Sequence, residues 1–138
     1  MEPSSQKGGF SMIKTELLVR SVLGPCRRDV RPFVYAAECI IQQSFAVGVP
    51  IENIHVTRDV YPKVAQILHV QPESVTRQVE RIANHCWDAG DRNRLYAILG
   101  KVPPLCPPPR EMLIYFAAYS YYGMPFQKAM DQQLAAIF

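Results

Sequence analysis

Apolar side chains recur along this chain at intervals of three and four residues, the spacing of one face of an α-helix. The clearest block follows Pro32, where apolar side chains stand at positions 33, 36, 37, 40, 41 and 45. No block alternates apolar and polar residues with a period of two, as a half-buried strand would. The pattern therefore predicts an all-α fold.

Proline and glycine divide this pattern into separate helices. Gly24-Pro25 ends the first block, Pro72 stands where a helix tolerates a missing N–H, and Gly90 is predicted to close the helix that Pro72 begins. Residues 102–109 contain five prolines and are predicted to form a stiff, extended connector. We expect helices over about 11–23, 33–47, 60–68, 72–89, 92–99, 110–122 and from 126 onward.

The length of 138 residues indicates one domain. We expect a flexible N-terminal tail over 1–11 and a helical domain over 12–138, whose C-terminal helices occupy 110–138. The tail has no apolar run typical of a secretion signal, and no later run is apolar enough for a membrane span. The four cysteines have no metal-ligand spacing, so we expect reduced thiols in a cytoplasmic protein with no metal and no cofactor.

Two of the predicted helices, 60–68 and 72–89, are separated by a break of three residues, which is typical of a helix-turn-helix. We expect about six helices around this motif at about 57–87, without a β-hairpin wing. If the apolar stripe of helix 72–89 faces inward, a polar face is left outside. That face presents Ser74, Arg77, Gln78, Arg81 and Asn84, flanked by Thr76 and Glu80. Arginine can bind guanine, and asparagine or glutamine can bind adenine, in the major groove of duplex DNA.

Charge adds little to this interpretation. The chain has 15 lysines and arginines against 12 acidic residues, a net charge of +3. Between Thr57 and Arg94 the basic residues are Arg58, Lys63, Arg77, Arg81, Arg92 and Arg94, and the acids are Asp59, Glu73, Glu80, Asp88 and Asp91. A net charge of +1 over the motif permits a polyanionic partner without requiring one.

Three short motifs resemble the C-terminal effector domain of the stage zero sporulation master regulator family. They are Val56–Ala65, with the pattern Tyr-Pro-x-hydrophobic-Ala, Val70–Arg77, with Pro-x-x-Val-x-Arg, and Trp87–Gly90. The similarity extends from about Lys14 to Tyr122. It implies a six-helix DNA-binding domain, without enzymatic activity, that controls transcription in an endospore-forming bacterium.

The resemblance also implies which residues contact DNA. By position, base contacts fall on Ser74, Thr76, Arg77, Glu80 and Arg81. Only Arg77 keeps the family residue, since Thr76 replaces a glutamate, Glu80 an arginine and Arg81 a histidine. We therefore expect a target sequence different from that of the family. Phosphate contacts are expected from Thr57, Arg58, Lys63 and the N–H groups around Glu73, at residues 72–74.

Regulators of this family carry a phosphoacceptor receiver domain before the effector domain. Here only a short segment precedes the first predicted helix, so we expect either a fragment or a stand-alone member. The helix over 110–122 is apolar nearly all round, which indicates a core helix or a surface shared with a partner. Family members bind as dimers, so a homodimer through the C-terminal helices is one expectation.

A second hypothesis is a protein-interaction module that keeps the fold and has little or no DNA binding. The near-neutral motif, Glu80 and the aromatic-rich helix over 110–122 favour it. An enzyme is not expected, because no paired carboxylates, activated nucleophile or glycine-rich phosphate loop stand at a suitable spacing.

Overall fold

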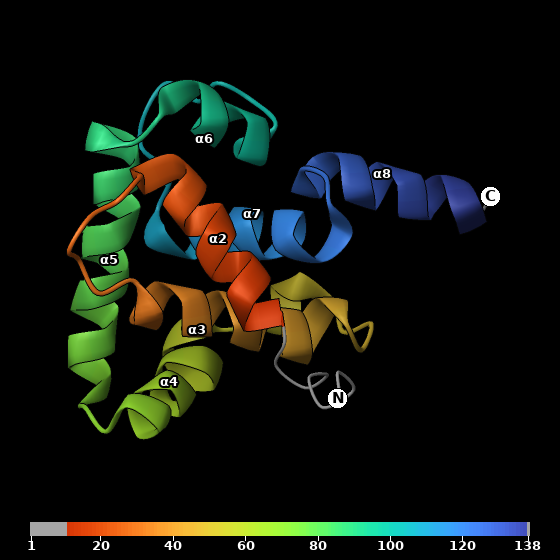
Figure 1. Cartoon of the computed structure of the whole chain (residues 1–138). Coiled ribbons are helices and arrows are strands. Elements are labelled where there is room, and N and C mark those ends of the chain that lie inside the picture. Colours follow the sequence, from red (N-terminus) through yellow and green to blue (C-terminus); the bar gives the residue numbers. More distant parts are fainter. Residues whose placement is uncertain (1–10, 138) are drawn as a thin grey trace, which may run out of the picture.

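The computed structural model describes residues 11–137, and over that range seven α-helices and no strand are present (Figure 1). This confirms the all-α prediction. The seven helices correspond to the seven ranges expected from periodicity and punctuation, one more than the six that the family resemblance implies, and residues 11–137 contain no β-hairpin wing. The predicted tail lies outside the described residues except for Ser11, which begins the first helix. The helices are α2 (Ser11–Leu23), α3 (Arg31–Ile40), α4 (Tyr61–Leu68), α5 (Pro72–Ala89), α6 (Arg92–Leu99), α7 (Pro109–Tyr122) and α8 (Phe126–Ile137).

Helices α3 and α7 form the centre of the core, and the remaining helices pack around them. Phe33 of α3 and Phe116 of α7 are fully buried, with ring centroids 5.2 Å apart in an edge-to-face arrangement. The apolar helix predicted at 110–122 is therefore largely core. Its buried residues are Met112, Leu113, Ile114, Phe116, Ala117, Ala118 and Ser120.

Proline marks the start of four helices, as its fixed φ and missing N–H favour. Helix α3 continues into a π-helical turn, Ile41–Phe45, which ends near Gly48. A second π-helical turn, Val56–Val60, leads directly into α4. The segment over 102–108 is irregular, and Pro109 is already the first residue of α7.

Gly90 ends α5 for a different reason from the one expected. Its φ of −78° is not left-handed, so the backbone there does not require glycine. A Cβ atom at this position would instead lie 2.5 Å from the carbonyl oxygen of Cys86 and 2.6 Å from Cγ1 of Val22. Gly90 thus allows the end of α5 to approach α2 closely.

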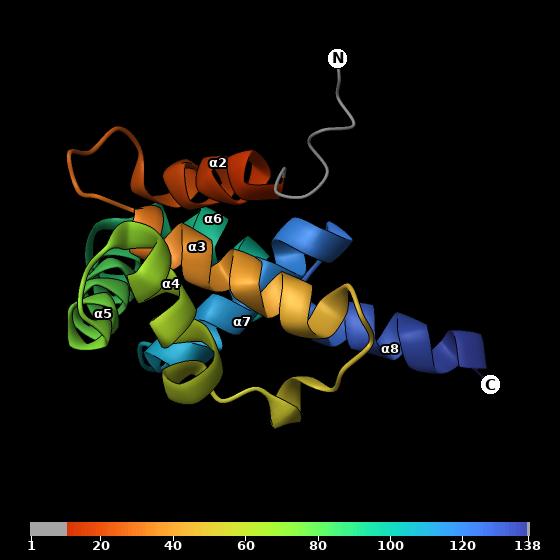
Figure 2. The ribbon, with the colours of Figure 1, turned by 90° about the horizontal axis from the view of Figure 1, so that it is seen from below.

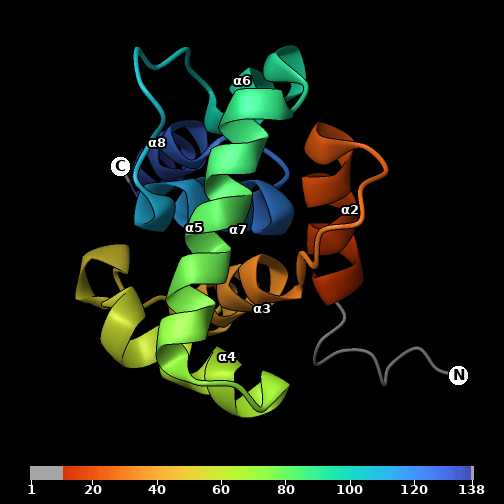
Figure 3. The same cartoon turned by 90° about the vertical axis from the view of Figure 1, so that its left-hand side faces the viewer.

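Helix α5 runs along one side of the molecule, from α4 at one end to α6 at the other, with α3 and α7 behind it (Figure 3). Its outer face is open along this length. Helix α8 lies on the opposite side and extends away from the body (Figures 1 and 2).

Candidate nucleic-acid interface

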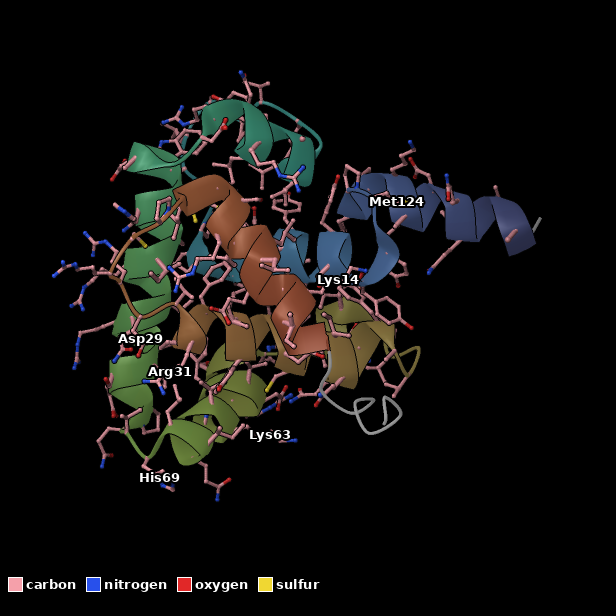
Figure 4. All side chains as sticks on the ribbon, viewed as in Figure 1. Lys14, Asp29, Arg31, Lys63, His69 and Met124 are labelled. Carbon is pink, nitrogen blue, oxygen red and sulfur yellow. The ribbon has the colours of Figure 1, made fainter. Side chains whose placement is uncertain are left out.

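Helices α4 and α5 are joined by a turn of three residues, His69 to Gln71. His69 adopts the left-handed conformation, with φ 58° and ψ 46°, and this ends α4. The N–H of Val70 donates to the carbonyl of Ala65 at 3.0 Å, which closes the last turn of α4. Figure 4 shows His69 at this corner, where the chain reverses from α4 into α5.

The inner face of α5 is the apolar stripe that periodicity predicts. Val75 and Val79 are fully buried, and Ile82 and Cys86 are buried beside them. Because these residues pack against α3, α4 and α7, the rotation of α5 about its axis is fixed. The polar residues of α5 consequently keep one orientation toward solvent.

All five predicted base-contacting residues lie on the outside of α5, but two of them have hydrogen bonds within the helix. Thr76, Arg77, Glu80 and Arg81 are exposed, and Ser74 is half-buried. The Ser74 hydroxyl accepts a hydrogen bond from Nε2 of Gln78 at 2.8 Å, and the Thr76 hydroxyl donates to the carbonyl of Pro72 at 3.1 Å. Neither Arg77 nor Arg81 forms an ion pair with any residue of the described range.

The outer face of α5 has two edges of different charge. Glu73, Thr76 and Glu80 follow one another at spacings of three and four, so they share one strip of the helix. This strip lies toward α4, because the charge of Glu80 acts on Tyr61 there: burial raises the pKa of Tyr61 to about 12, and Glu80 adds to the rise. Arg81 lies on the other edge, with Arg77 between the two.

Arg81 shares a surface hollow of about 360 Å³ with the loop between α2 and α3. The hollow is lined by Arg28, Asp29, Gln78, Arg81 and Ile82. Sequence reasoning missed Arg28 and its neighbour Arg27, because the motif at 57–87 gives no sign of a contact with a loop so far away along the chain. Three arginines at positions 27, 28 and 31, directly after Gly24-Pro25, were the available signal.

The predicted phosphate-contacting residues differ in how available they are. Arg58 is engaged by Asp59 through two hydrogen bonds of 2.8 and 2.9 Å, so its charge is compensated. These bonds, with a further one from the N–H of His55, lower the pKa of Asp59 to about 2. Thr57 is exposed beside Arg58, in the π-helical turn before α4.

Lys63 is exposed on α4 and lies toward α3, since its charge partly offsets the rise that burial causes in the pKa of Cys39 (Figure 4). We expected the N–H groups at residues 72–74 to contact phosphate, but only one of the three is available. Pro72 has no N–H, and the N–H of Ser74 donates to the carbonyl of Gln71 at 2.9 Å. Of these three residues, Glu73 is left to offer its N–H to a phosphate.

Two further arginines of the motif region have structural roles. The guanidinium of Arg92 lies 4.1 Å from the Trp87 ring centroid and donates to the Trp87 carbonyl. Arg94 donates to the Ser21 hydroxyl at 2.9 Å. Arg92 thus connects α6 to α5, and Arg94 connects α6 to α2.

The C-terminal helices form a second surface feature. An apolar groove of about 500 Å³ runs between α8 and the segment over 44–52. Phe126, Met130 and Leu134, which stand four residues apart on one side of α8, line it. Leu134 is 54% exposed, and Val49, which also lines the groove, is 37% exposed.

The cysteines are all free thiols, and burial raises the pKa of Cys86 to about 12. No group of three or more potential metal ligands is gathered in residues 11–137. None of the helices over this range is both long and apolar enough to cross a membrane.

Comparison of the chain with models of protein families, with curated proteins and with solved structures finds no match. The resemblance to the sporulation regulator effector domain therefore rests on the three motifs alone and stays a prediction.

Proposed function

We propose that this chain binds duplex DNA, with α4 and α5 acting as a helix-turn-helix and α5 entering the major groove. The observation that supports this most directly is the contrast between the two faces of α5. Its inner face is buried in the core, while Arg77 and Arg81 are exposed and have no ion-pair partner within residues 11–137. A rigid helix with unpaired guanidinium groups suits bidentate recognition of guanine.

In this proposal Arg77 is the principal base-reading residue, because it lies at the middle of the outer face. Glu80, on the edge toward α4, would accept a hydrogen bond from cytosine. The Ser74 hydroxyl accepts a hydrogen bond within α5, so it would still donate one to a base. The Thr76 hydroxyl donates one within α5, so it would still accept one from a base. Regulation of transcription in an endospore-forming bacterium, as the motif resemblance implies, belongs to the same proposal.

The test is binding to fluorescent random-sequence duplex DNA, followed by anisotropy over a salt series. Sites are then selected from the random library, and the Arg77→Ala variant is compared on the selected site. We expect Arg77→Ala to cost about 1–3 kcal/mol there, and Lys63→Ala to reduce the salt slope by about one without changing sequence preference. Absence of binding by the parent protein at low salt would overturn the proposal.

A second candidate function is a protein-interaction module, and the groove beside α8 favours it. This groove exposes Leu134 and Val49 on the side of the molecule away from α5. An unpartnered apolar surface on a protruding helix suits a second copy of the chain, and a homodimer through α8 is compatible with DNA binding by α5. Sedimentation of the parent protein over a concentration series separates the cases. Self-association without DNA binding supports the module alone.

A further inference from the structure

The loop between α2 and α3 brings Arg28 beside α5, and Arg27 precedes it in the same loop. Arg27 and Arg28 are both exposed, and no side-chain hydrogen bond or ion pair within residues 11–137 engages either one. Their cationic groups are therefore available to a partner.

The loop itself is held in place at both ends. The N–H of Gly24 donates to the carbonyl of Arg20 at 2.7 Å, and Nη1 of Arg20 donates to the carbonyl of Cys26 at 3.2 Å. At the other end Val30 is buried, with 2% of its surface exposed. An arginine pair on an anchored loop loses less freedom on binding than one on a free chain.

The one acid in the loop does not cancel this charge. Asp29 accepts hydrogen bonds from Nε and Nη2 of Arg31 at 2.9 and 2.8 Å, and from the N–H of Arg31 as well (Figure 4). These bonds from Arg31 lower the pKa of Asp29, which stays ionised and compensated by Arg31. Arg27 and Arg28 are then the uncompensated charges of the loop.

Helix α5 supplies the opposite wall. Arg28 and Arg81 line the same hollow of about 360 Å³, whereas Glu80 lies about 100° around the helix from Arg81, toward Tyr61. Gln78 and Asp29 also line the hollow: Gln78 donates one amide hydrogen to the Ser74 hydroxyl, and Asp29 is the carboxylate that Arg31 compensates. The edge of α5 beside the loop is therefore cationic, whereas the edge toward α4 is acidic.

We propose that Arg27, Arg28 and Arg81 form a phosphate-binding edge that holds one strand of the DNA backbone beside the groove that α5 enters. Guanidinium groups bind phosphate oxygens bidentately, and the hollow between Arg28 and Arg81 has room for a phosphate group. This inference rests on the proposed DNA binding, and it assigns Arg81 to a phosphate in place of the base contact expected from the sequence. It adds a contact outside the helix-turn-helix, supplied by residues that precede the motif by about thirty positions.

The test uses the full chain and a random-sequence duplex. The variant Arg27→Gln/Arg28→Gln is compared with Lys14→Gln/Lys128→Gln, which removes the same charge from α2 and α8. Lys14 lies at the end of α2 away from α5 (Figure 4), and Lys128 lies on α8. We expect the arginine variant to lower the slope of log Kobs against log salt by about 1.8, corresponding to two phosphate contacts, and the lysine variant to leave it unchanged.

Several outcomes distinguish this inference from the function it rests on. If the parent protein does not bind DNA, the proposed function fails. If the parent binds and both double variants keep its slope, the phosphate-binding edge is refuted and DNA binding stands. A change in sequence preference with an unchanged slope also refutes it. The Arg27→Lys/Arg28→Lys variant retains both charges and should restore the slope, which separates charge loss from misfolding.

Discussion

Replacing Gly90 by alanine tests the close approach of α5 to α2. The backbone at Gly90 has φ −78° and ψ 172°, which any residue adopts, so the substitution carries no conformational strain. The added Cβ would lie 2.5 Å from the Cys86 carbonyl oxygen and 2.6 Å from Cγ1 of Val22. Val22 is only 2% exposed and cannot move into solvent. The N–H of Asp91 also bonds to the Val22 carbonyl at 2.8 Å, so the two backbones cannot separate freely.

We expect this overpacking to cost about 1–3 kcal/mol. Thermal unfolding followed by circular dichroism should then show a Tm lower by roughly 4–12 °C. The Val22→Ala variant removes one of the two clashing atoms, so the double variant Val22→Ala/Gly90→Ala should lose less stability than the two single changes added together.

Gly24→Ala is the matched control. It has a φ of +70° and no atom within 4 Å of an added Cβ, so its cost of about 1–2 kcal/mol comes from the backbone alone. The loss of stability in the double variant Val22→Ala/Gly24→Ala should therefore equal the sum of the losses in the two single variants. If Gly90→Ala costs less than Gly24→Ala, and its effect adds to that of Val22→Ala, the steric explanation is refuted.

Two more predictions concern charges beside the motif. The depressed pKa of Asp59, about 2, gives stability that is present above its unfolded value of about 3.9 and is lost as the pH falls toward 2. The Tm difference between the parent and Asp59→Asn should therefore be full at pH 6 and shrink as the pH falls through 2; a difference that is as large at pH 2 as at pH 6 contradicts the assignment. Glu80→Gln should strengthen binding to random duplex DNA roughly two- to fivefold at low salt, because one negative charge facing the phosphates is removed. Glu111→Gln on α7 is the control, and equal effects from both would show that only net charge matters.

The helices of this fold were predictable from the sequence because local chemistry decides them. Apolar residues at intervals of three and four gave the buried faces, and Pro72 with Gly90 bounded α5 at the residues observed. The π-helical turns were not predictable. The spacing of apolar residues there is the same as in an α-helix, so periodicity does not distinguish the two.

The candidate interface was predictable only in part. Which residues of α5 face outward follows from its apolar stripe, and Arg77 and Arg81 are exposed on that basis. Which neighbours flank those residues depends on long-range packing. The engagement of Arg58 by Asp59, and the approach of Arg28 to Arg81 across the hollow, needed the folded chain.

The net charge of the motif region, +1, is a poor guide to its interaction with DNA because the charges are segregated. The acids Glu73 and Glu80 lie on the edge of α5 toward α4. Arg81 lies on the other edge, beside the loop between α2 and α3 that carries Arg28. A phosphate held between Arg28 and Arg81 contacts these two guanidinium groups directly, so it experiences a local field that is more positive than the sum of the charges suggests. The same reasoning gives the two edges separate roles: the cationic edge would supply affinity through phosphates, and Glu80 would supply discrimination between bases.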